Sequence, residues 1–259
     1  MEAILAEMGT EVFWAGLGQI ILINIILSGD NAVVIALASR SLPPRQQKQA
    51  IFWGSGAAIA MRIVLTIFAV AMLQWPWLKL IGAVLLLWIG IKLLLPEEGH
   101  GEIEGAGSMA GAIRTILIAD LVMSLDNVIA VAAAAKDSWT LIIIGLLISI
   151  PLVIFGSQLL LKVMERFPII ITIGAALLGF VAGEMAATDP AIRPWLAEHF
   201  VMAGEKGELA MVGPIALKYI SGAFGAIFVV LLGKYLLSRR AKAKLVDLAN
   251  KSDQPAGGH

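Results

Sequence analysis

The chain consists largely of long apolar runs, each about as long as a helix that crosses a lipid bilayer. Hydrophobic residues make up 59% of its 259 residues, and charged residues only 15%. A helix needs about 20 apolar residues to cross the hydrocarbon of a bilayer, and the apolar runs of this chain have that length. The sequence therefore predicts an all-α, polytopic membrane protein.

Seven apolar segments are long enough to be transmembrane helices, and proline-containing breakers such as Leu42-Pro43-Pro44 separate several of them. The predicted helices occupy residues 12–38, 51–73, 77–95, 113–135, 139–161, 168–187 and 215–237. The predicted regions are a first three-helix repeat (1–95), a cytoplasmic linker (96–112), a second three-helix repeat (113–187), an extracytoplasmic loop (188–214), a seventh helix (215–237) and a basic cytoplasmic tail (238–259).

The composition also excludes several classes of function. The 19 basic and 19 acidic residues cancel, so nothing in the charge balance favours a nucleic-acid partner. The chain has no cysteine, which excludes disulfides, thiolate metal sites and thiol catalysis. No nucleotide-binding loop is present, so transport would draw on ion gradients or on the gradient of the metal itself. We expect neither an enzyme nor a bound cofactor.

One polar motif occurs twice inside the apolar runs. The sequence Asn-Ile-Ile-Leu-Ser-Gly-Asp-Asn at 24–31 returns as Asp-Leu-Val-Met-Ser-Leu-Asp-Asn at 120–127. Carboxylates and carboxamides are costly in hydrocarbon unless they are paired, hydrated or coordinating an ion, and they typically mark function there. We therefore expect a cation site in the membrane, formed by both copies.

Helical geometry relates the polar residues of each copy. In each motif copy the first polar residue, the serine and the final asparagine share one face of a helix with 3.6 residues per turn. Asp30 and Asp126 are rotated about 120° around the helix axis from that face. Either each helix contacts the cation through two faces, or the chain unwinds near Gly29, where freed carbonyl groups would also bind a cation. The candidate metal ligands are Asn24, Ser28, Asp30, Asn31, Asp120, Ser124, Asp126 and Asn127.

The donor types favour a hard divalent cation. Aspartate, asparagine and serine oxygens suit Mn²⁺, Mg²⁺ and Ca²⁺. Zn²⁺ and Cu²⁺ favour imidazole or thiolate, and all three histidines lie outside the predicted helices. Met123 lies one turn from both Asp120 and Asp126, where it is either a soft ligand that favours Mn²⁺ or a packing residue.

Arg62 lies at the middle of the second predicted helix. A guanidinium at that depth needs a partner, so we expect it to pair with one of the three aspartates and to hold the site together when no cation is bound. Three aspartates and one arginine leave two net negative charges, which one divalent cation neutralises. Protonation of an aspartate would instead allow proton-coupled antiport.

Basic residues in the short loops predict the orientation of the helices. Such residues favour the cytoplasmic side, which places the N-terminus outside and the C-terminus in the cytoplasm. The first and fourth helices are then antiparallel, giving an inverted repeat of three plus three helices and one extra C-terminal helix. Substrate sites in such repeats lie near the bilayer midplane. The basic residues used are Arg40, Arg45, Lys48, Lys162, Arg166, Arg239, Arg240, Lys242 and Lys244.

The paired motifs continue as Ala-Val-Val-Ile-Ala-Leu-Ala and Val-Ile-Ala-Val-Ala-Ala-Ala, and together they resemble the TerC family of membrane proteins, in particular its YjbE-like branch. The resemblance covers predicted helices one to six and implies a place in the LysE-type transporter superfamily. It further implies export of Mn²⁺ across a bacterial inner (plasma) membrane. The positions that match the family motif are Asp30, Asn31, Asp120, Asp126 and Asn127. Members often carry an acidic residue where this chain has Asn24, so a weaker or more selective first half-site is expected.

The sequence thus predicts a secondary transporter that exports a divalent cation, with Mn²⁺ as substrate, by alternating access of the two repeats. Export of a small organic cation, such as a basic amino acid, is an alternative that needs an apolar pocket beside the carboxylates. A further alternative is a non-transporting scaffold for metal handling or secretion, whose polar groups only join helices. An intramembrane aspartyl protease is disfavoured because its Gly-x-Gly-Asp and Tyr-Asp patterns are absent.

The expected partners are a divalent metal ion and the lipid bilayer. A homo-oligomer or a further membrane partner is compatible with the sequence, which identifies neither.

Overall fold

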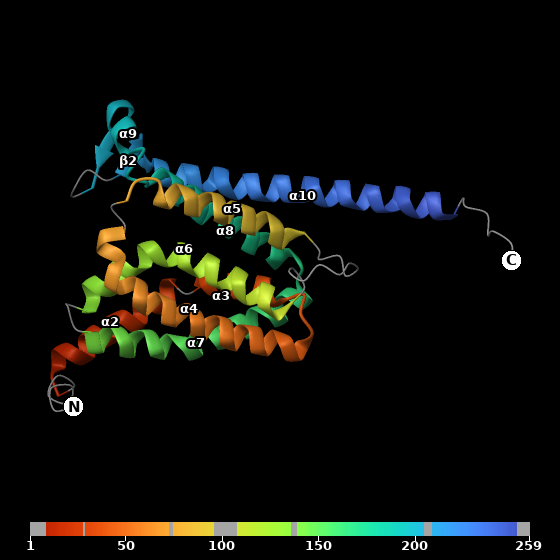
Figure 1. The fold of residues 1–259 in the computed structure, drawn as a ribbon. Helices are drawn as coiled ribbons and strands as arrows, with labels where there is room; N and C mark the ends of the chain where they lie inside the picture. The colour runs from red at the N-terminus through yellow and green to blue at the C-terminus, as the bar shows by residue number, and fades with distance from the viewer. Residues whose placement is uncertain are drawn as a thin grey trace.

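The structure, a computed structural model, describes residues 9–27, 29–72, 75–95, 108–135, 139–204 and 209–252. Most of them belong to long helices that lie along a common direction (Figure 1). These helices are α2 (Glu11–Leu27), α3 (Gly29–Ser39), α4 (Pro44–Met72), α5 (Leu78–Leu94), α6 (Met109–Ala135), α7 (Trp139–Arg166), α8 (Ile169–Ala187) and α10 (Leu217–Ser252). Between α8 and α10 lie the short helix α9 (Arg193–His199) and the strands β1 (Val201–Ala203), β2 (Leu209–Val212) and β3 (Ile215–Ala216).

Apolar character along these helices supports a membrane location. In the part of the chain that the structure describes, three helical segments are long and apolar enough to cross a bilayer: Ile143–Arg166, Ile169–Ala187 and Leu217–Arg240. Shorter apolar helices occupy Phe13–Leu22 and Gly29–Ser39. Large apolar side chains lie exposed on the outer faces of these helices. Such exposure is expected when the helices are surrounded by lipid and not by water. The prediction of a mostly helical membrane protein is confirmed.

The described helices pack as two bundles, which Figure 1 shows one beside the other. The motif bundle contains α2, α3, α4, α6 and α7, with α4 packed along α6 and with α7 against α2, α3 and α4. The lateral bundle contains α5, α8 and α10, and α8 packs against both of the others. An apolar cluster joins the two bundles and consists of Val34, Ala83, Leu86, Ile89, Ala119, Val122, Met123, Leu178, Ala182 and Met185.

Within the lateral bundle, α8 and α10 meet backbone to backbone. A Cβ atom at Gly183 would overlap the carbonyl group of Ser221, and one at Gly179 would overlap that of Gly225. Only glycine fits at these two positions of α8, and its lack of a side chain lets the helices approach closely. The backbones of α8 and α10 therefore lie closer together than any side chain at these positions would allow.

A buried carboxylate connects the end of α8 to the start of α5. Asp189 is fully buried, and it accepts hydrogen bonds from the backbone N–H groups of Trp77 at 3.0 Å, Leu80 at 2.9 Å and Ala191 at 2.7 Å. The first N–H groups of a helix have no partner within the helix, so Asp189 caps α5. Trp77, directly before α5, has a left-handed φ of 72°.

A small antiparallel sheet follows α9. Its strands pair in the order β1–β2–β3, with Met202 opposite Ala210 and Met211 opposite Ala216. Strands this short give no membrane-length apolar run, so the pattern that predicts the long helices does not predict the sheet. The sheet lies at the same end of the molecule as the start of α2 (Figure 1).

At the opposite end, α10 continues beyond the other helices (Figure 1). Its apolar part ends at Arg240, whereas the helix itself continues to Ser252. Arg239, Arg240 and Lys242 are exposed at this transition. The helix therefore has an apolar part followed by a polar extension.

Candidate functional site

The two copies of the polar motif lie in neighbouring helices of the motif bundle. The second copy is part of α6, which is helical without interruption from Met109 to Ala135. The first copy is divided between α2, which ends at Leu27, and α3, which begins at Gly29. Position 28, between these two helices, lies outside the described residues, so the predicted unwinding near Gly29 stays a prediction, while α6 runs without a break through Leu125. Since α3 packs against α6, the copies face a common region.

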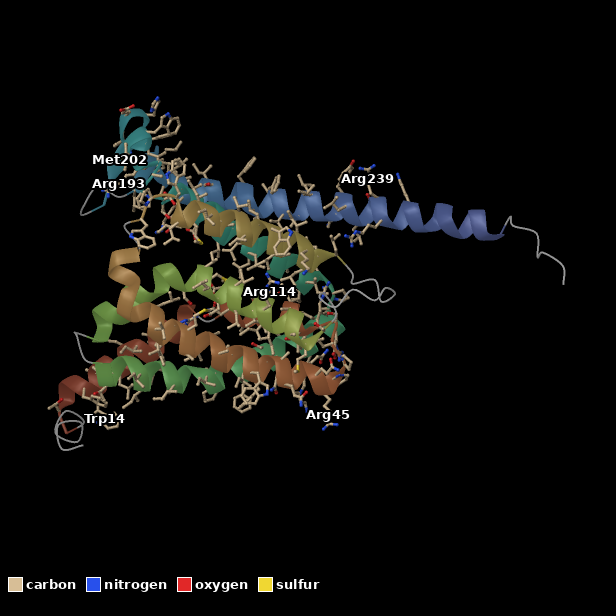
Figure 2. The ribbon with its side chains drawn as sticks, viewed as in Figure 1. Trp14, Arg45, Arg114, Arg193, Met202 and Arg239 are labelled. Atoms are coloured by element: carbon tan, nitrogen blue, oxygen red, sulfur yellow. The ribbon has the colours of Figure 1, made fainter. Side chains whose placement is uncertain are left out.

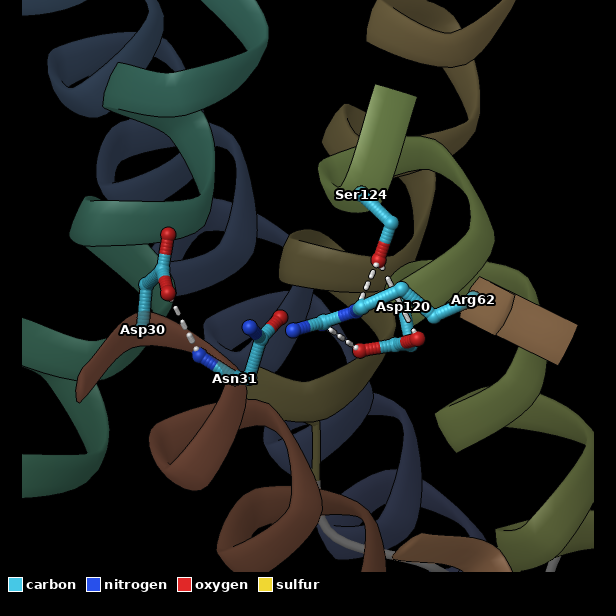
Figure 3. A network of polar contacts seen from close by, with 5 residues as sticks. All are labelled: Asp30, Asn31, Arg62, Asp120 and Ser124. Atoms are coloured by element: carbon cyan, nitrogen blue, oxygen red, sulfur yellow. Dashed lines mark hydrogen bonds and ion pairs between the residues drawn. The ribbon is translucent and has the colours of Figure 1, made fainter. Parts of the chain in front are cut away.

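A closed network of three buried side chains lies at the centre of this region (Figure 3). Arg62 reaches from α4 to α6, where its Nη2 donates to Asp120 Oδ1 at 2.5 Å and its Nε donates to Ser124 Oγ at 2.9 Å. The Ser124 hydroxyl donates in turn to Asp120 Oδ2 at 3.2 Å. Exposure is 4% for Arg62, 6% for Asp120 and 0% for Ser124, so the ion pair is shielded from solvent.

The spacing of the motif explains this geometry. Asp120 and Ser124 are four residues apart on α6, so their side chains lie one above the other on one face. A guanidinium group has several N–H donors in a fixed fork and can contact both at once. The sequence predicts that Arg62 pairs with an aspartate but does not choose among three. In the structure the partner is Asp120.

Asp30 and Asn31 bring the first motif copy to the same place. Both lie in the first turn of α3, and Asn31 is buried. The backbone N–H of Asn31 donates to Asp30 Oδ1 at 2.7 Å. Asp30 interacts electrostatically with both Arg62 and Asp120. Side chains from α3, α4 and α6 therefore converge on one charged region (Figure 3).

The other predicted ligands, Asn24, Ser28, Asp126 and Asn127, lie outside the side chains that the structure describes. The backbone of α6 continues through positions 126 and 127, which follow Asp120 by about two turns. Among the described side chains, no group of three or more acidic, histidine or cysteine residues is placed to hold a metal ion. The ligand set therefore stays a prediction.

Two further buried residues have structural roles. Met123 is buried in the apolar cluster between the bundles, which supports the packing role that the sequence allowed and gives no sign of the ligand role. Asp189 was not singled out from the sequence. The sequence around it shows only that an aspartate and Pro190 follow an apolar run. Ordinary solvent-exposed loops have the same pattern, so it does not predict a capping role.

Basic side chains lie at both ends of the described helices. Figure 2 shows Arg45 and Arg239 toward the end from which α10 extends, and Arg193 at the opposite end near the sheet. At the first of these ends, Arg40 Nη2 donates to the carbonyl oxygen of Leu95 at 3.5 Å. The side-chain amide of Gln47 donates to the carbonyl oxygen of Arg40 at 3.1 Å.

Long apolar helices around a buried ion pair define a polytopic integral membrane protein with a charged site inside its helical core. Residues 9–243 match the family described as "Integral membrane protein TerC family". The chain therefore belongs to the TerC family, as its paired motifs predict.

Similar bacterial proteins support this assignment. "Uncharacterized membrane protein YjbE" of Bacillus subtilis (strain 168) is 46% identical over 177 residues, which cover 68% of this chain and 81% of that protein. "Uncharacterized membrane protein YceF" of the same strain is 27% identical over 187 residues, or 68% and 72% of the two chains. "UPF0053 inner membrane protein YgdQ" of Escherichia coli (strain K12) is 28% identical over 174 residues, or 60% and 73%. No solved structure matches the chain.

Proposed function

We propose that this protein is a secondary transporter that exports a divalent cation, with Mn²⁺ as the preferred substrate. The observation that carries the proposal is the buried Asp120–Arg62 ion pair beside Asp30, in helices that bear the two motif copies. Charged groups inside membrane helices are costly, and they typically mark the pathways of ions and substrates.

The chemistry of the site supports a hard divalent cation. Carboxylate, carboxamide and hydroxyl oxygens suit Mn²⁺, Mg²⁺ and Ca²⁺. With Asp126 included, three aspartates oppose the single charge of Arg62, and the remaining two negative charges match one divalent cation. Mn²⁺ is preferred among the three because the TerC resemblance implies it.

Packing suggests which parts move during transport. Each bundle contains both members of a predicted repeat pair: α3 with α6 and α4 with α7 in the motif bundle, and α5 with α8 in the lateral bundle. This grouping is compatible with an inverted repeat of three plus three helices, with α10 as the extra element. We infer that the motif bundle and the lateral bundle move relative to each other, and that the boundary of motion does not follow the two sequence repeats.

The interface between the bundles suits such a motion. It is apolar, and in one of its contacts the Val122 side chain of α6 packs against the backbone of Gly82 in α5. Apolar contacts are not directional, so they tolerate sliding better than a network of hydrogen bonds. The backbone contact of α8 with α10 would keep the lateral bundle stiff while it moves.

We place the protein in a bacterial inner membrane with the N-terminus outside and the C-terminus in the cytoplasm. Arg45 and Arg239 lie toward one end of the molecule, and basic residues favour the cytoplasmic side. Export against a gradient would then draw on an ion gradient, because the sequence has no nucleotide-binding loop.

The test is Mn²⁺ flux into proteoliposomes that contain the purified protein under an imposed pH gradient, with Mg²⁺, Ca²⁺ and Zn²⁺ as competitors. We expect Mn²⁺ flux in the wild type and no flux in Asp30→Asn or Asp126→Asn. Both variants should still insert into membranes. Arg114→Gln changes an exposed charge on α6 and serves as the control. Full Mn²⁺ flux in both aspartate variants would contradict the assignment of the site.

Other outcomes identify a different function. Flux of lysine or arginine without Mn²⁺ flux would indicate an exporter of organic cations. No flux of either substrate from well-folded protein, under both gradient directions, would indicate a scaffold. A scaffold would still capture its partner in pulldowns when the aspartates are replaced.

A further inference from the structure

Arg62 is the positive charge that satisfies Asp120 in the structure. Its guanidinium contacts one carboxylate oxygen of Asp120 directly and reaches the other through Ser124. All three side chains are buried. A cation that binds Asp120 at this position must therefore displace a guanidinium that is held by one charge-assisted hydrogen bond to Asp120 and a second hydrogen bond to Ser124.

We propose that Arg62 is a specificity-determining residue: its guanidinium acts as a tethered monovalent counter-ion of Asp120 that divalent cations displace and monovalent cations do not. This inference rests on the proposed function, because it concerns the same site. The inference explains how the site selects divalent over monovalent cations, which the oxygen donors alone do not explain.

The charge of the incoming cation decides whether it displaces the guanidinium. A free monovalent cation that displaces the guanidinium brings no more charge than it removes, and it also loses its hydration and its translational freedom. The guanidinium is attached to α4, so its contact with Asp120 costs less hydration and less translational freedom than the binding of a free ion. A divalent cation brings twice the charge into a region of low dielectric, where the gain in Coulomb energy is large. Displacement is thus favourable only for the higher charge.

The neighbouring carboxylate strengthens this discrimination. Asp30 interacts electrostatically with both Asp120 and Arg62. Once the guanidinium is displaced, these two carboxylates present two negative charges, which a monovalent ion neutralises only by half and a divalent ion neutralises fully. Na⁺ and K⁺ are far more abundant than Mn²⁺ in cells, so a site of oxygen donors needs such a filter.

The experiment measures Mn²⁺ binding by electron paramagnetic resonance to full-length protein in nanodiscs, with and without a large excess of K⁺. Ionic strength is kept constant with N-methylglucamine chloride. The variants are Arg62→Gln, which removes the tethered charge, Arg62→Lys, which keeps the charge but loses the fork that contacts Ser124 and Asp120 together, and Arg114→Gln as the exposed control.

Wild type and Arg114→Gln are expected to bind Mn²⁺ without competition from K⁺. Arg62→Gln is expected to bind Mn²⁺ more tightly, by about tenfold or more since a competing charge is removed, and to lose Mn²⁺ to K⁺. Arg62→Lys should remain insensitive to K⁺ and bind Mn²⁺ more tightly than the wild type, though less tightly than Arg62→Gln. Size-exclusion chromatography establishes that each variant is folded.

The inference would be overturned if folded Arg62→Gln bound Mn²⁺ no more tightly than the wild type and K⁺ did not compete. The proposed function would still stand in that case, provided that the wild type binds Mn²⁺. If Arg62→Gln does not fold, Arg62→Lys decides: binding no tighter than that of the wild type overturns the inference. If neither wild type nor folded Arg62→Gln binds Mn²⁺, both proposals are wrong.

Discussion

The carboxylate of Asp189 lies 3.0 Å from the backbone nitrogen of Trp77, although 112 residues separate them in the sequence. The contact joins the end of α8 to the start of α5, which are the sixth and third predicted transmembrane helices. Since α8 also contacts α10 through backbone atoms, this one carboxylate helps hold the lateral bundle together at the end near the sheet.

Replacing Asp189 tests that role. Asp189→Ala removes the buried acceptor of three backbone N–H groups and should lower the free energy of unfolding by about 2 kcal/mol or more. Asp189→Asn keeps a carbonyl oxygen and should cost less. Thermal unfolding in detergent measures both effects. Glu198→Ala, on the exposed side of α9, is the control, and an Asp189→Ala midpoint equal to that of this control would refute the capping role.

The ion pair of the site gives a second prediction. Asp120→Asn removes the negative charge that faces the buried Arg62 guanidinium, and loss of one partner of a buried pair costs about 3–5 kcal/mol. The double variant Asp120→Asn/Arg62→Gln should recover much of that loss because no uncompensated charge remains. Unfolding followed by tryptophan fluorescence in one detergent compares the two. Strictly additive losses would show that the two side chains are not coupled.

A disulfide across the bundle interface tests relative motion. Gly82 in α5 and Val122 in α6 place their Cβ positions 3.7 Å apart, within the range of about 3.5–4.5 Å found in disulfides. The chain has no cysteine, so Gly82→Cys/Val122→Cys forms a defined cross-link without background. Oxidation should stop Mn²⁺ flux in proteoliposomes, and reduction should restore it.

The matched control lies inside the motif bundle. Gly54 in α4 and Ile116 in α6 place their Cβ positions 3.6 Å apart, and a disulfide between cysteines there should leave flux unchanged. Equal loss of flux in the two oxidised pairs would contradict a boundary of motion between the bundles. Full flux through the oxidised Gly82→Cys/Val122→Cys protein would contradict it as well.

The backbone contact of α8 and α10 gives a fourth prediction. Gly183→Ala adds a methyl group that overlaps the backbone of Ser221, so the helices must separate, at a cost of about 1–3 kcal/mol for overpacking. Gly56→Ala in α4 meets nothing within 4 Å and should be neutral or stabilising by up to about 1 kcal/mol through helix propensity. The thermal midpoint of Gly183→Ala in detergent should therefore lie below that of Gly56→Ala. Equal midpoints would mean that the close approach is not required.

The long helices were predictable because their cause is local. Runs of apolar residues such as 168–187 have the length and hydropathy of a membrane helix, and α8 covers that range as Ile169–Ala187. The repeated motif likewise indicated that α3 and α6 carry equivalent polar groups. The pairing of Arg62 was predictable in kind, because a guanidinium at that depth needs a partner.

The remaining features depend on which surfaces meet in three dimensions. The sequence offered three aspartates for Arg62, and only the packing of α4 along α6 makes Asp120 the partner. The grouping of α5, α8 and α10 follows from glycine contacts between distant segments, which periodicity within one helix does not reveal. The strands after α9 and the capping role of Asp189 also depend on contacts between segments and not on a pattern within one segment.

The length of α10 has a mechanical consequence. At 1.5 Å per residue, its 36 residues extend about 54 Å, whereas the hydrocarbon layer is about 30 Å thick. The polar part after Arg240 therefore works as a rigid spacer that carries whatever is attached to it away from the bilayer surface (Figure 1). A fluorescent protein fused after Ser252 would stand clear of the lipid headgroups, and its orientation would report the tilt of the lateral bundle.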